Sequence, residues 1–395
     1  MKKFRIAPEI VLYDQVSDFC RDMEFDSGDI IFINDVTYDC YFKGYTGKAI
    51  IIDYGKYASG EPTDRMVEAI LGDIQGLDAR RIIGIGGGAI LDVAKLFSLN
   101  KISPAAELFD HTIPCVRDKK LILVPTTCGT GSETTNISIL ELTERNTKLG
   151  LADDALYADK AVLIPELISS LPYRVFATSS IDALVHAMES FTSPKASEFS
   201  QLYSRQAMRM ILNGYMELTG WKKDESERSC VKESDKDTDF NAEIMKRRLN
   251  EPLRRDFLLA STYAGVAFGN AGCAAVHAMS YPLGAKYHVP HGESNYVLLL
   301  AVYREYQKLE PDGKIHELNS CLGEILSCDE QEVYDRLELL LSDVLEHKPL
   351  SAYGATREDI EEFTRIVMTG QGRLMANNYT ELQENDVKRI YESVF

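Results

Sequence analysis

Short runs of apolar residues, closed by turn-forming residues, recur through the first 165 positions of the chain. They occur at residues 29–35, 48–53, 81–88, 121–127 and 160–165. Because these runs are continuously apolar rather than alternating, they predict strands that are buried on both faces, as in a parallel sheet. Residues 63–75 and 90–100 lie between such runs and repeat apolar positions at helical spacing. The alternation predicts βαβ units and a Rossmann-like α/β fold with a doubly wound, mainly parallel sheet.

The strand pattern stops after Leu171–Pro172, and long helical patterns follow, beginning with residues 176–191. A chain of 395 residues also exceeds the usual size of a single hydrophobic core. We therefore predict an α/β domain at residues 1–170 and an all-α domain at residues 171–395. Residues 221–248 are dense in charges of both signs and poor in apolar residues, which predicts a surface insertion.

The composition is that of a soluble globular protein, with 45% hydrophobic and 26% charged residues. The formal net charge of −18 repels phosphate backbones and anionic lipid, so we expect a small-molecule ligand and neither nucleic acid nor a membrane as partner. Residues 257–285 carry no Asp, Glu, Lys or Arg, but their many Gly, Ser, Thr and Tyr residues favour a helix buried in protein over a membrane span. The eight cysteines form no CxxC motif and the first residues contain no apolar signal region, so a reducing, cytoplasmic location is predicted.

Three consecutive glycines, Gly86, Gly87 and Gly88, end one predicted strand and open a helix. Backbone amides at such a turn can approach a pyrophosphate beside the helix N-terminus. Glycines also occur at strand-to-helix turns for packing alone, so this match by itself leaves both interpretations open. The next predicted strand ends in a second turn, whose hydroxyl groups belong to Thr126, Thr127, Thr130 and Ser132. Because the carboxyl ends of parallel strands share one edge of a sheet, the two turns together favour a nucleotide site there.

An acidic residue that binds the adenosine ribose is expected to follow a strand. The spacing from the glycines indicates Glu107 or Asp110, whereas Asp35 closes an earlier predicted strand. A carboxylate at Asp35 would also repel the additional phosphate of NADP. From the spacing alone, the three acids remain alternatives.

Asp182 and His186 are four residues apart in a predicted helix, so their side chains share one face. Glu189, three residues further on, lies on the same face. Taken alone, such a group is more often part of a solvated polar face than a set of metal ligands.

Residues 276–294 hold three of the seven histidines of the chain. We expect the helix to be interrupted at Pro282 and Gly284, so that the chain turns and brings His277 and His291 back toward each other. With the earlier aspartate and histidine they offer one carboxylate and three imidazoles. This set suits a borderline divalent ion, Fe²⁺ or Zn²⁺, and leaves a coordination position for substrate.

Four motifs follow one another along the chain: GGGAILDVAK, PTTCGTGSE, IDALVHAMESF and HAMSYPLGAKYHVPHGESN, at residues 86–95, 125–133, 181–191 and 277–295. In these motifs, and over nearly its whole length, the chain resembles the iron-containing, group III alcohol dehydrogenases. The resemblance implies a dehydroquinate synthase-like N-terminal domain that binds the dinucleotide, followed by a metal-binding helical domain. It further implies a cytoplasmic, NAD-dependent oxidoreductase that transfers hydride to or from a small alcohol or aldehyde, holds Fe²⁺ or Zn²⁺, and assembles as a homodimer or higher homo-oligomer.

Within this family, the sequence is similar to members that interconvert 4-hydroxybutyrate and succinate semialdehyde with NADH. One alternative is a general dehydrogenase for short-chain alcohols, diols or lactaldehyde, and another is a lyase of the dehydroquinate synthase type. A nucleotide sensor without catalysis ranks last, because a sensor does not need a set of metal ligands. Lys286 is a candidate for the group that binds the substrate carboxylate, although a solvated surface charge explains it equally well.

The resemblance also implies roles for individual residues. The metal ligands would be Asp182, His186, His277 and His291, and the cofactor would contact Asp35, Gly86, Gly87, Gly88, Asp92, Thr126, Thr127, Thr130 and Lys148. On this ground Asp35 is preferred over the other two acids. Many family members have a histidine four residues after the third ligand, where this chain has Tyr281, so His277 and Tyr281 are predicted as catalytic residues, with the phenol as a proton relay or a pocket wall. The charged segment 221–248 is also longer than is usual in the family.

Overall fold

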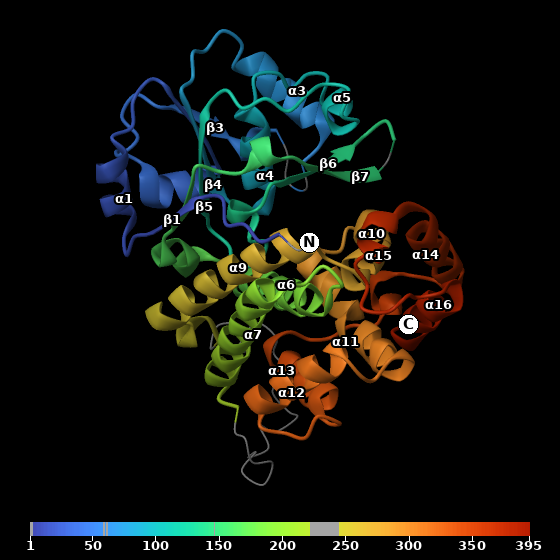
Figure 1. Cartoon of the computed structure of the whole chain (residues 1–395). Helices are drawn as coiled ribbons and strands as arrows, with labels where there is room; N and C mark the ends of the chain where they lie inside the picture. Colours follow the sequence, from blue (N-terminus) through green and yellow to red (C-terminus); the bar gives the residue numbers. More distant parts are fainter. Residues whose placement is uncertain (1–2, 58–59, 61, 146, 222–244) are drawn as a thin grey trace. The chain divides into compact units, whose positions relative to one another are not determined.

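The computed structural model describes residues 3–57, 60, 62–145, 147–221 and 245–395 (Figure 1). The chain divides into two compact units. One unit comprises Ile6–Leu171, and the other comprises Pro172–Phe395 together with the residues up to Arg5. Most of the charged segment 221–248 lies outside the described residues.

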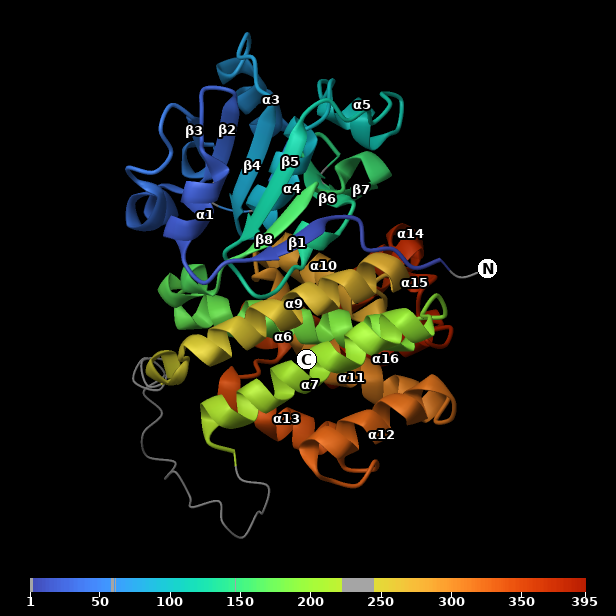
Figure 2. The same ribbon diagram turned by 60° about the vertical axis from the view of Figure 1, so that its left-hand side comes forward.

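A six-stranded parallel sheet forms the centre of the Ile6–Leu171 unit. Its strands lie in the order β1-β8-β5-β4-β2-β3 (Figure 2), with the bounds β1 Glu9–Leu12, β2 Asp29–Ile33, β3 Ile50–Asp53, β4 Arg81–Gly86, β5 Lys120–Pro125 and β8 Lys160–Leu163. The helices of this unit are α1 Val16–Met23, α2 Asp35–Thr37, α3 Asp64–Asp73, α4 Gly88–Phe97 and α5 Ala105–Phe109. A separate antiparallel hairpin consists of β6 Ile137–Leu142 and β7 Thr147–Ala152.

Neighbouring residues of β2 are buried on opposite faces of the sheet. Ile30 and Phe32 pack into a core cluster with residues of α3 and α4. Ile31 and Ile33 pack into a second cluster, with residues of α1. Because helices cover both faces, both sets of strand side chains are apolar, which produces the continuous runs in the sequence. The predicted doubly wound α/β fold is confirmed, whereas the hairpin of β6 and β7 was not predicted.

The other unit is helical over the residues that the structure describes. Its helices are α6 Tyr173–Thr192, α7 Glu198–Thr219, α9 Glu251–Ala271, α10 Ala275–Tyr287, α11 His291–Leu309, α12 Lys314–Leu326, α13 Val333–Val344, α14 Arg357–Gly370, α15 Gly372–Met375 and α16 Glu384–Ser393. The uncharged residues 257–285 form most of α9 and α10, and α9 packs against α6 and α7 (Figure 2). Among the described helices, none combines the length and apolar character that crossing a membrane requires.

The predicted break at Pro282 and Gly284 is wrong, because α10 continues through both residues to Tyr287. Pro282 is buried, and the packing around the helix outweighs the cost of the missing backbone donor. A side-chain carbon at Gly284 would lie 3.4 Å from the Val289 carbonyl oxygen, which is an ordinary van der Waals distance, so close packing does not require glycine at this position. The chain turns instead at His288, which has a left-handed φ of 53°.

Candidate functional site

The four residues predicted as metal ligands come together from three helices. Asp182 and His186 lie on α6, His277 lies in the first turn of α10, and His291 is the first residue of α11. The Nε2 atoms of His277 and His186 are 3.0 Å apart. Asp182 Oδ1 lies 3.6 Å from His277 Nε2 and 3.6 Å from His291 Nε2. We call these four residues the donor cluster.

The donor cluster is buried on one side and open on the other. Asp182, His186 and His277 are 2%, 5% and 2% exposed, respectively. The side chain of His291 is 34% exposed. A small molecule can therefore approach from the side of His291 while the other donors stay shielded from water.

Close packing between α6 and α11 sets the distance from Asp182 to His291. A side-chain carbon at Gly292 would lie 2.0 Å from the carbonyl oxygen of Thr178 and 3.3 Å from the Asp182 Cβ. Only glycine permits this approach, which brings the first residue of α11 against the face of α6. The residue is part of the HGESN sequence, yet the pattern alone gave it no role.

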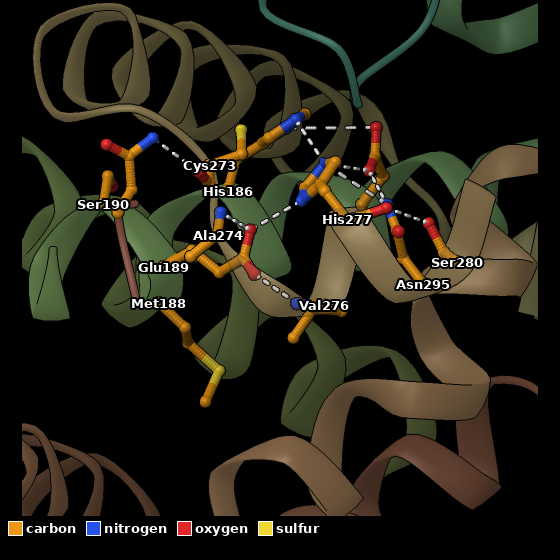
Figure 3. Close-up of polar contacts among 12 residues, drawn as sticks. His186, Met188, Glu189, Ser190, Cys273, Ala274, Val276, His277, Ser280 and Asn295 are labelled. Atoms are coloured by element: carbon orange, nitrogen blue, oxygen red, sulfur yellow. Dashed lines mark hydrogen bonds and ion pairs between the residues drawn. The ribbon is translucent and has the colours of Figure 1, made fainter. Parts of the chain in front are cut away.

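Glu189, one helical turn after His186, holds the start of α10. Its carboxylate accepts hydrogen bonds from the backbone N–H groups of Ala274 at 2.9 Å and Val276 at 2.6 Å (Figure 3). Glu189 Oε2 also lies 2.6 Å from His277 Nδ1. This contact places the imidazole proton on Nδ1 and leaves the Nε2 lone pair directed at the donor cluster. The sequence placed Glu189 on the face of the ligands but did not reveal this positioning function.

Two further residues that contact the donor cluster, Asn295 and Cys273, were not identified from the sequence. Asn295 Nδ2 donates to Asp182 Oδ1 at 2.7 Å, while its Oδ1 is buried without a partner among the described residues. The sulfur of Cys273 and one ring nitrogen each of His186 and His277 lie within 4.8 Å of one another (Figure 3). Burial raises the pKa of the Cys273 thiol, but the charges of His277 and His186 outweigh burial and lower it to about 7. The position of Cys273, four residues before His277, was the available signal in the sequence.

The electrostatics of the cluster favour a positive charge at its centre. Burial raises the pKa of Asp182, but His186, His291 and His277 together hold it well below its usual range. Burial lowers the pKa of His186 and of His277, yet both are raised overall, mainly by Asp182 for the former and by Cys273 and Glu189 for the latter. A divalent cation supplies positive charge to the same donors, and one carboxylate with three imidazoles is a set that Fe²⁺ and Zn²⁺ accept. The residues present therefore fit such an ion.

Tyr281 lies one turn after His277 on α10, and its ring centroid is 6.0 Å from that of His291. Burial raises the pKa of the phenol. Lys286, on the last turn of the same helix, forms ion pairs with Asp359 at 2.5 Å and Glu362 at 2.6 Å. Two carboxylates thus compensate its charge, which argues against Lys286 as the group that binds a substrate carboxylate.

In the α/β unit, the two predicted phosphate-binding turns lie side by side. Strands β4 and β5 are neighbours, with Gly86 opposite Pro125, so both turns extend from the same edge of the sheet. A side-chain carbon at Gly88 would lie 2.7 Å from Thr130 Cγ2, and one at Gly87 would lie 3.3 Å from Thr127 Cγ2. Thr126 N donates to the Gly86 carbonyl at 3.0 Å. The glycines are therefore needed for contact between the turns, and their bare amides stand at the start of α4.

Asp92, predicted to contact the cofactor, is engaged with other protein groups. Its Oδ1 accepts from Ser132 Oγ at 2.6 Å, and its Oδ2 accepts from the backbone N–H of Ile139 at 3.0 Å. Lys95, which is fully buried, lies 3.3 Å from the same carboxylate and donates to Ser132 Oγ at 2.6 Å. Asp92 and Lys95 thus hold the second turn and the hairpin in place, a contribution that the motif did not reveal.

The other predicted cofactor residues lie at separate positions of this unit. Asp35 is the exposed first residue of α2, two residues after the end of β2, and β2 is the neighbour of β4 in the sheet. Asp110 forms an ion pair with Arg145, so its carboxylate already has a partner. Lys148 lies on β7, opposite Glu141 of β6.

Comparison with known proteins places the chain in a family. Residues 41–165 match the iron-containing alcohol dehydrogenase model, and residues 176–232 and 241–395 match the model of the C-terminal part of the Fe-containing alcohol dehydrogenase family. The chain belongs to the iron-containing alcohol dehydrogenase family, whose members are oxidoreductases. This finding confirms the family that the four motifs indicated.

Among curated relatives, the chain is similar to 4-hydroxybutyrate dehydrogenase of Clostridium kluyveri, with 42% identity over 395 residues and 100% of both chains covered. It is 36% identical over 323 residues to long-chain-alcohol dehydrogenase 1 of Geobacillus thermodenitrificans, covering 80% of this chain and 74% of the relative. Among solved structures, the fold is similar to 1,3-propanediol oxidoreductase, with a TM-score of 0.80, 21% identity and 100% of both chains covered. It is also similar to sulfoacetaldehyde reductase from Bifidobacterium kashiwanohense in complex with NAD+, with a TM-score of 0.82, 20% identity, and 100% and 98% covered.

Proposed function

We propose that the chain is an NAD-dependent, metal-containing dehydrogenase that interconverts 4-hydroxybutyrate and succinate semialdehyde. The observation that carries this proposal is the donor cluster, which combines one carboxylate and three imidazoles with an open side at His291. The similarity to a 4-hydroxybutyrate dehydrogenase over the full length of the chain supports the choice of substrate.

In this proposal Asp182, His186, His277 and His291 hold Fe²⁺ or Zn²⁺. The bound ion supplies a Lewis acid for the alcohol or aldehyde oxygen of the substrate, and NAD supplies the hydride acceptor. Glu189 keeps the proton of His277 on Nδ1, so that Nε2 remains available as a donor. The burial of three of the four ligands excludes water from the reacting end of the substrate.

Tyr281 is assigned to the proton of the alcohol group. Because burial raises its pKa, the phenol stays protonated near neutral pH and donates a hydrogen bond from Oη to the substrate oxygen. In the direction of aldehyde reduction, this hydroxyl can release its proton toward the new alcohol. Its place one turn after His277 and its 6.0 Å ring separation from His291 support this role.

The cofactor is assigned to the two turns at the edge of the parallel sheet. The amides of Gly86, Gly87 and Gly88 bind the diphosphate at the start of α4, and Thr126, Thr127, Thr130 and Lys148 add donors. The exposed Asp35 binds the adenosine ribose and repels a 2′-phosphate, which favours NAD over NADP. Asp92 acts on the cofactor indirectly, because it holds Ser132 of the second turn.

We also propose a cytoplasmic location and a homodimer or higher homo-oligomer. The seven cysteines in the described part of the chain are all free, as is usual in a reducing compartment. Phe199 and Leu202 on α7 are 63% and 64% exposed, and such apolar side chains suit an interface between copies. Light scattering of the purified protein tests the assembly, and a monomer at micromolar concentration would contradict it.

The test of function is an absorbance assay of NADH with succinate semialdehyde, after reconstitution with Fe²⁺ or Zn²⁺. We expect NADH to be consumed, and in the reverse direction 4-hydroxybutyrate to be oxidised with higher kcat/KM than 1,4-butanediol. Equal efficiencies for these two alcohols would indicate a general alcohol dehydrogenase. Turnover of a substrate without net change in NADH would instead indicate a lyase.

Asp182→Ala tests the donor cluster directly. The substitution removes its only carboxylate, so we expect turnover to fall by more than about 100-fold, beyond the loss typical of an outer-shell partner. NADH binding, followed by fluorescence, should be retained. Asp335→Ala, at an exposed residue of α13, is the control and should keep full turnover. Near-normal turnover of Asp182→Ala would contradict the metal role.

A further inference from the structure

A substrate with a carboxylate at its far end needs a cationic side chain near the donor cluster. Among the described residues, the helices that carry the predicted metal donors offer no Lys or Arg side chain that is free of an ion pair. Each basic residue on α6, α10 and α11 has an acidic partner. The pairs are Arg174 with Glu293, Lys286 with Asp359 and Glu362, Arg304 with Asp335 and Glu338, and Lys308 with Glu305. A substrate carboxylate would have to displace a protein carboxylate at any of them.

Arg373 differs from these residues. It belongs to α15, which packs against α10 (Figure 1). Its side chain is exposed, and within the described residues its guanidinium group has neither a carboxylate nor a hydrogen-bond partner. Binding of an anion there would break no existing ion pair.

The backbone around Arg373 is fixed against the segment that leads into His277. Asn377 Nδ2 donates to the carbonyl oxygens of Cys273 at 2.9 Å and Arg373 at 3.4 Å. Gly272 has a φ of 82°, and a side-chain carbon there would lie 2.5 Å from Asn377 Nδ2. The turn that carries Arg373 is therefore tied, through Asn377, to the residues just before the third predicted ligand.

The helix that carries Arg373 packs against the helix that carries Tyr281 and His277. The Tyr281 ring lies 6.0 Å from the ring of His291, which is the exposed member of the cluster. Arg373 is therefore placed on a helix that neighbours the element holding both the phenol and the third predicted metal ligand.

From this geometry we propose that Arg373 binds the carboxylate of a hydroxy-acid or aldehyde-acid substrate whose oxygen end reaches the donor cluster. The inference rests on the proposed function and names the residue that selects an acid over an uncharged alcohol. A planar guanidinium group can donate two parallel N–H bonds to one carboxylate, which fixes direction as well as charge. Lysine offers a point charge without this second bond.

The test compares succinate semialdehyde with butanal, an aldehyde with the same number of carbons and no carboxylate. For Arg373→Met we expect kcat/KM for succinate semialdehyde to fall about tenfold or more, mainly through KM, while kcat/KM for butanal stays within about twofold. Arg373→Lys should recover part of the loss. Arg209→Met, which removes an exposed arginine from α7, is the control and should change neither aldehyde.

The outcomes separate this inference from the proposed function. If the wild-type protein fails to prefer succinate semialdehyde over butanal, the proposed function is wrong and the inference is overturned with it. If the wild type shows the preference and Arg373→Met retains it, Arg373 is not the carboxylate partner although the function stands. An equal loss for both aldehydes in Arg373→Met would assign Arg373 a structural role and overturn the inference. Butanal turnover thus serves as the internal check on folding.

Discussion

Replacing Glu189 with glutamine isolates its contribution to the donor cluster. Its carboxylate contacts three donors: Ala274 N at 2.9 Å, Val276 N at 2.6 Å and His277 Nδ1 at 2.6 Å. Glutamine keeps the size of the side chain but exchanges one acceptor oxygen for an NH₂ group. A buried N–H group then loses its acceptor, which costs about 1–3 kcal/mol of stability.

The effect on metal binding follows from the imidazole proton. When the amide NH₂ faces His277 Nδ1, that nitrogen has to accept a hydrogen bond, and the ring proton moves to Nε2. Nε2 is the atom that lies 3.0 Å from His186 Nε2 and 3.6 Å from Asp182 Oδ1, where a cation needs a lone pair. Loss of an outer-shell partner of a ligating histidine typically reduces metal affinity by about 10–100-fold, and we expect this range for Glu189→Gln.

The assay is competition of metal-free protein with a chelator for Zn²⁺, together with urea unfolding of the same preparation. Glu305→Gln is the matched control, because Glu305 is also a largely buried carboxylate but lies on the part of α11 away from His291. Its side chain forms an ion pair with Arg389 of α16 at 2.6 Å. The control should lose stability and keep its metal affinity. If Glu189→Gln lost stability but bound Zn²⁺ as tightly as the wild type, Glu189 would only cap the start of α10, and the reasoning about the tautomer would be refuted.

Two further predictions concern other parts of the chain. Gly88→Ala places a carbon 2.7 Å from Thr130 Cγ2, and this overpacking, which costs about 1–3 kcal/mol, should separate the two turns and weaken NADH binding in a fluorescence titration. Gly72→Ala is the control, because Gly72 has open space around it. An unchanged NADH affinity of Gly88→Ala would contradict the role of the turns. Burial raises the pKa of Asp359, but hydrogen bonds from Lys286 and Thr356 hold this pKa well below its usual range. The ionised Asp359 carboxylate therefore stabilises the fold above the unfolded pKa of about 4, and this stabilisation is lost as the pH falls toward the folded pKa. The stability difference between wild type and Asp359→Asn, measured by urea unfolding, should therefore shrink below about pH 4, and a difference independent of pH would disprove the assignment.

The α/β fold was predictable because its strands are buried on both faces. Continuous runs such as residues 29–35 and 81–88 are typical of strands that helices cover on both faces, so the local sequence indicated the tertiary arrangement. The β6–β7 hairpin was not predicted, since its strands are only partly covered and Lys148 and Glu141 interrupt the apolar pattern.

The turn between α10 and α11 was predicted at the wrong residues, because packing overrides local helix propensity there. Proline and glycine usually end helices, but in α10 the buried surroundings of Pro282 override that preference, and the helix continues through Gly284. Local propensity is a small energy term, and packing over a whole helix is larger.

The sequence by itself determined the sheet, the two glycine- and threonine-rich turns, and the residue types of the donor cluster, because spacing within one strand or helix is enough to specify them. Only the tertiary structure decided how Asp182, His277 and His291 meet, and it alone revealed the contacts of Glu189 and the positions of Cys273, Asn295 and Arg373. These residues come from several elements, up to 191 positions apart from Asp182 to Arg373 in the chain. Their proximity depends on close helix packing at positions such as Gly292, which no periodicity along the chain records.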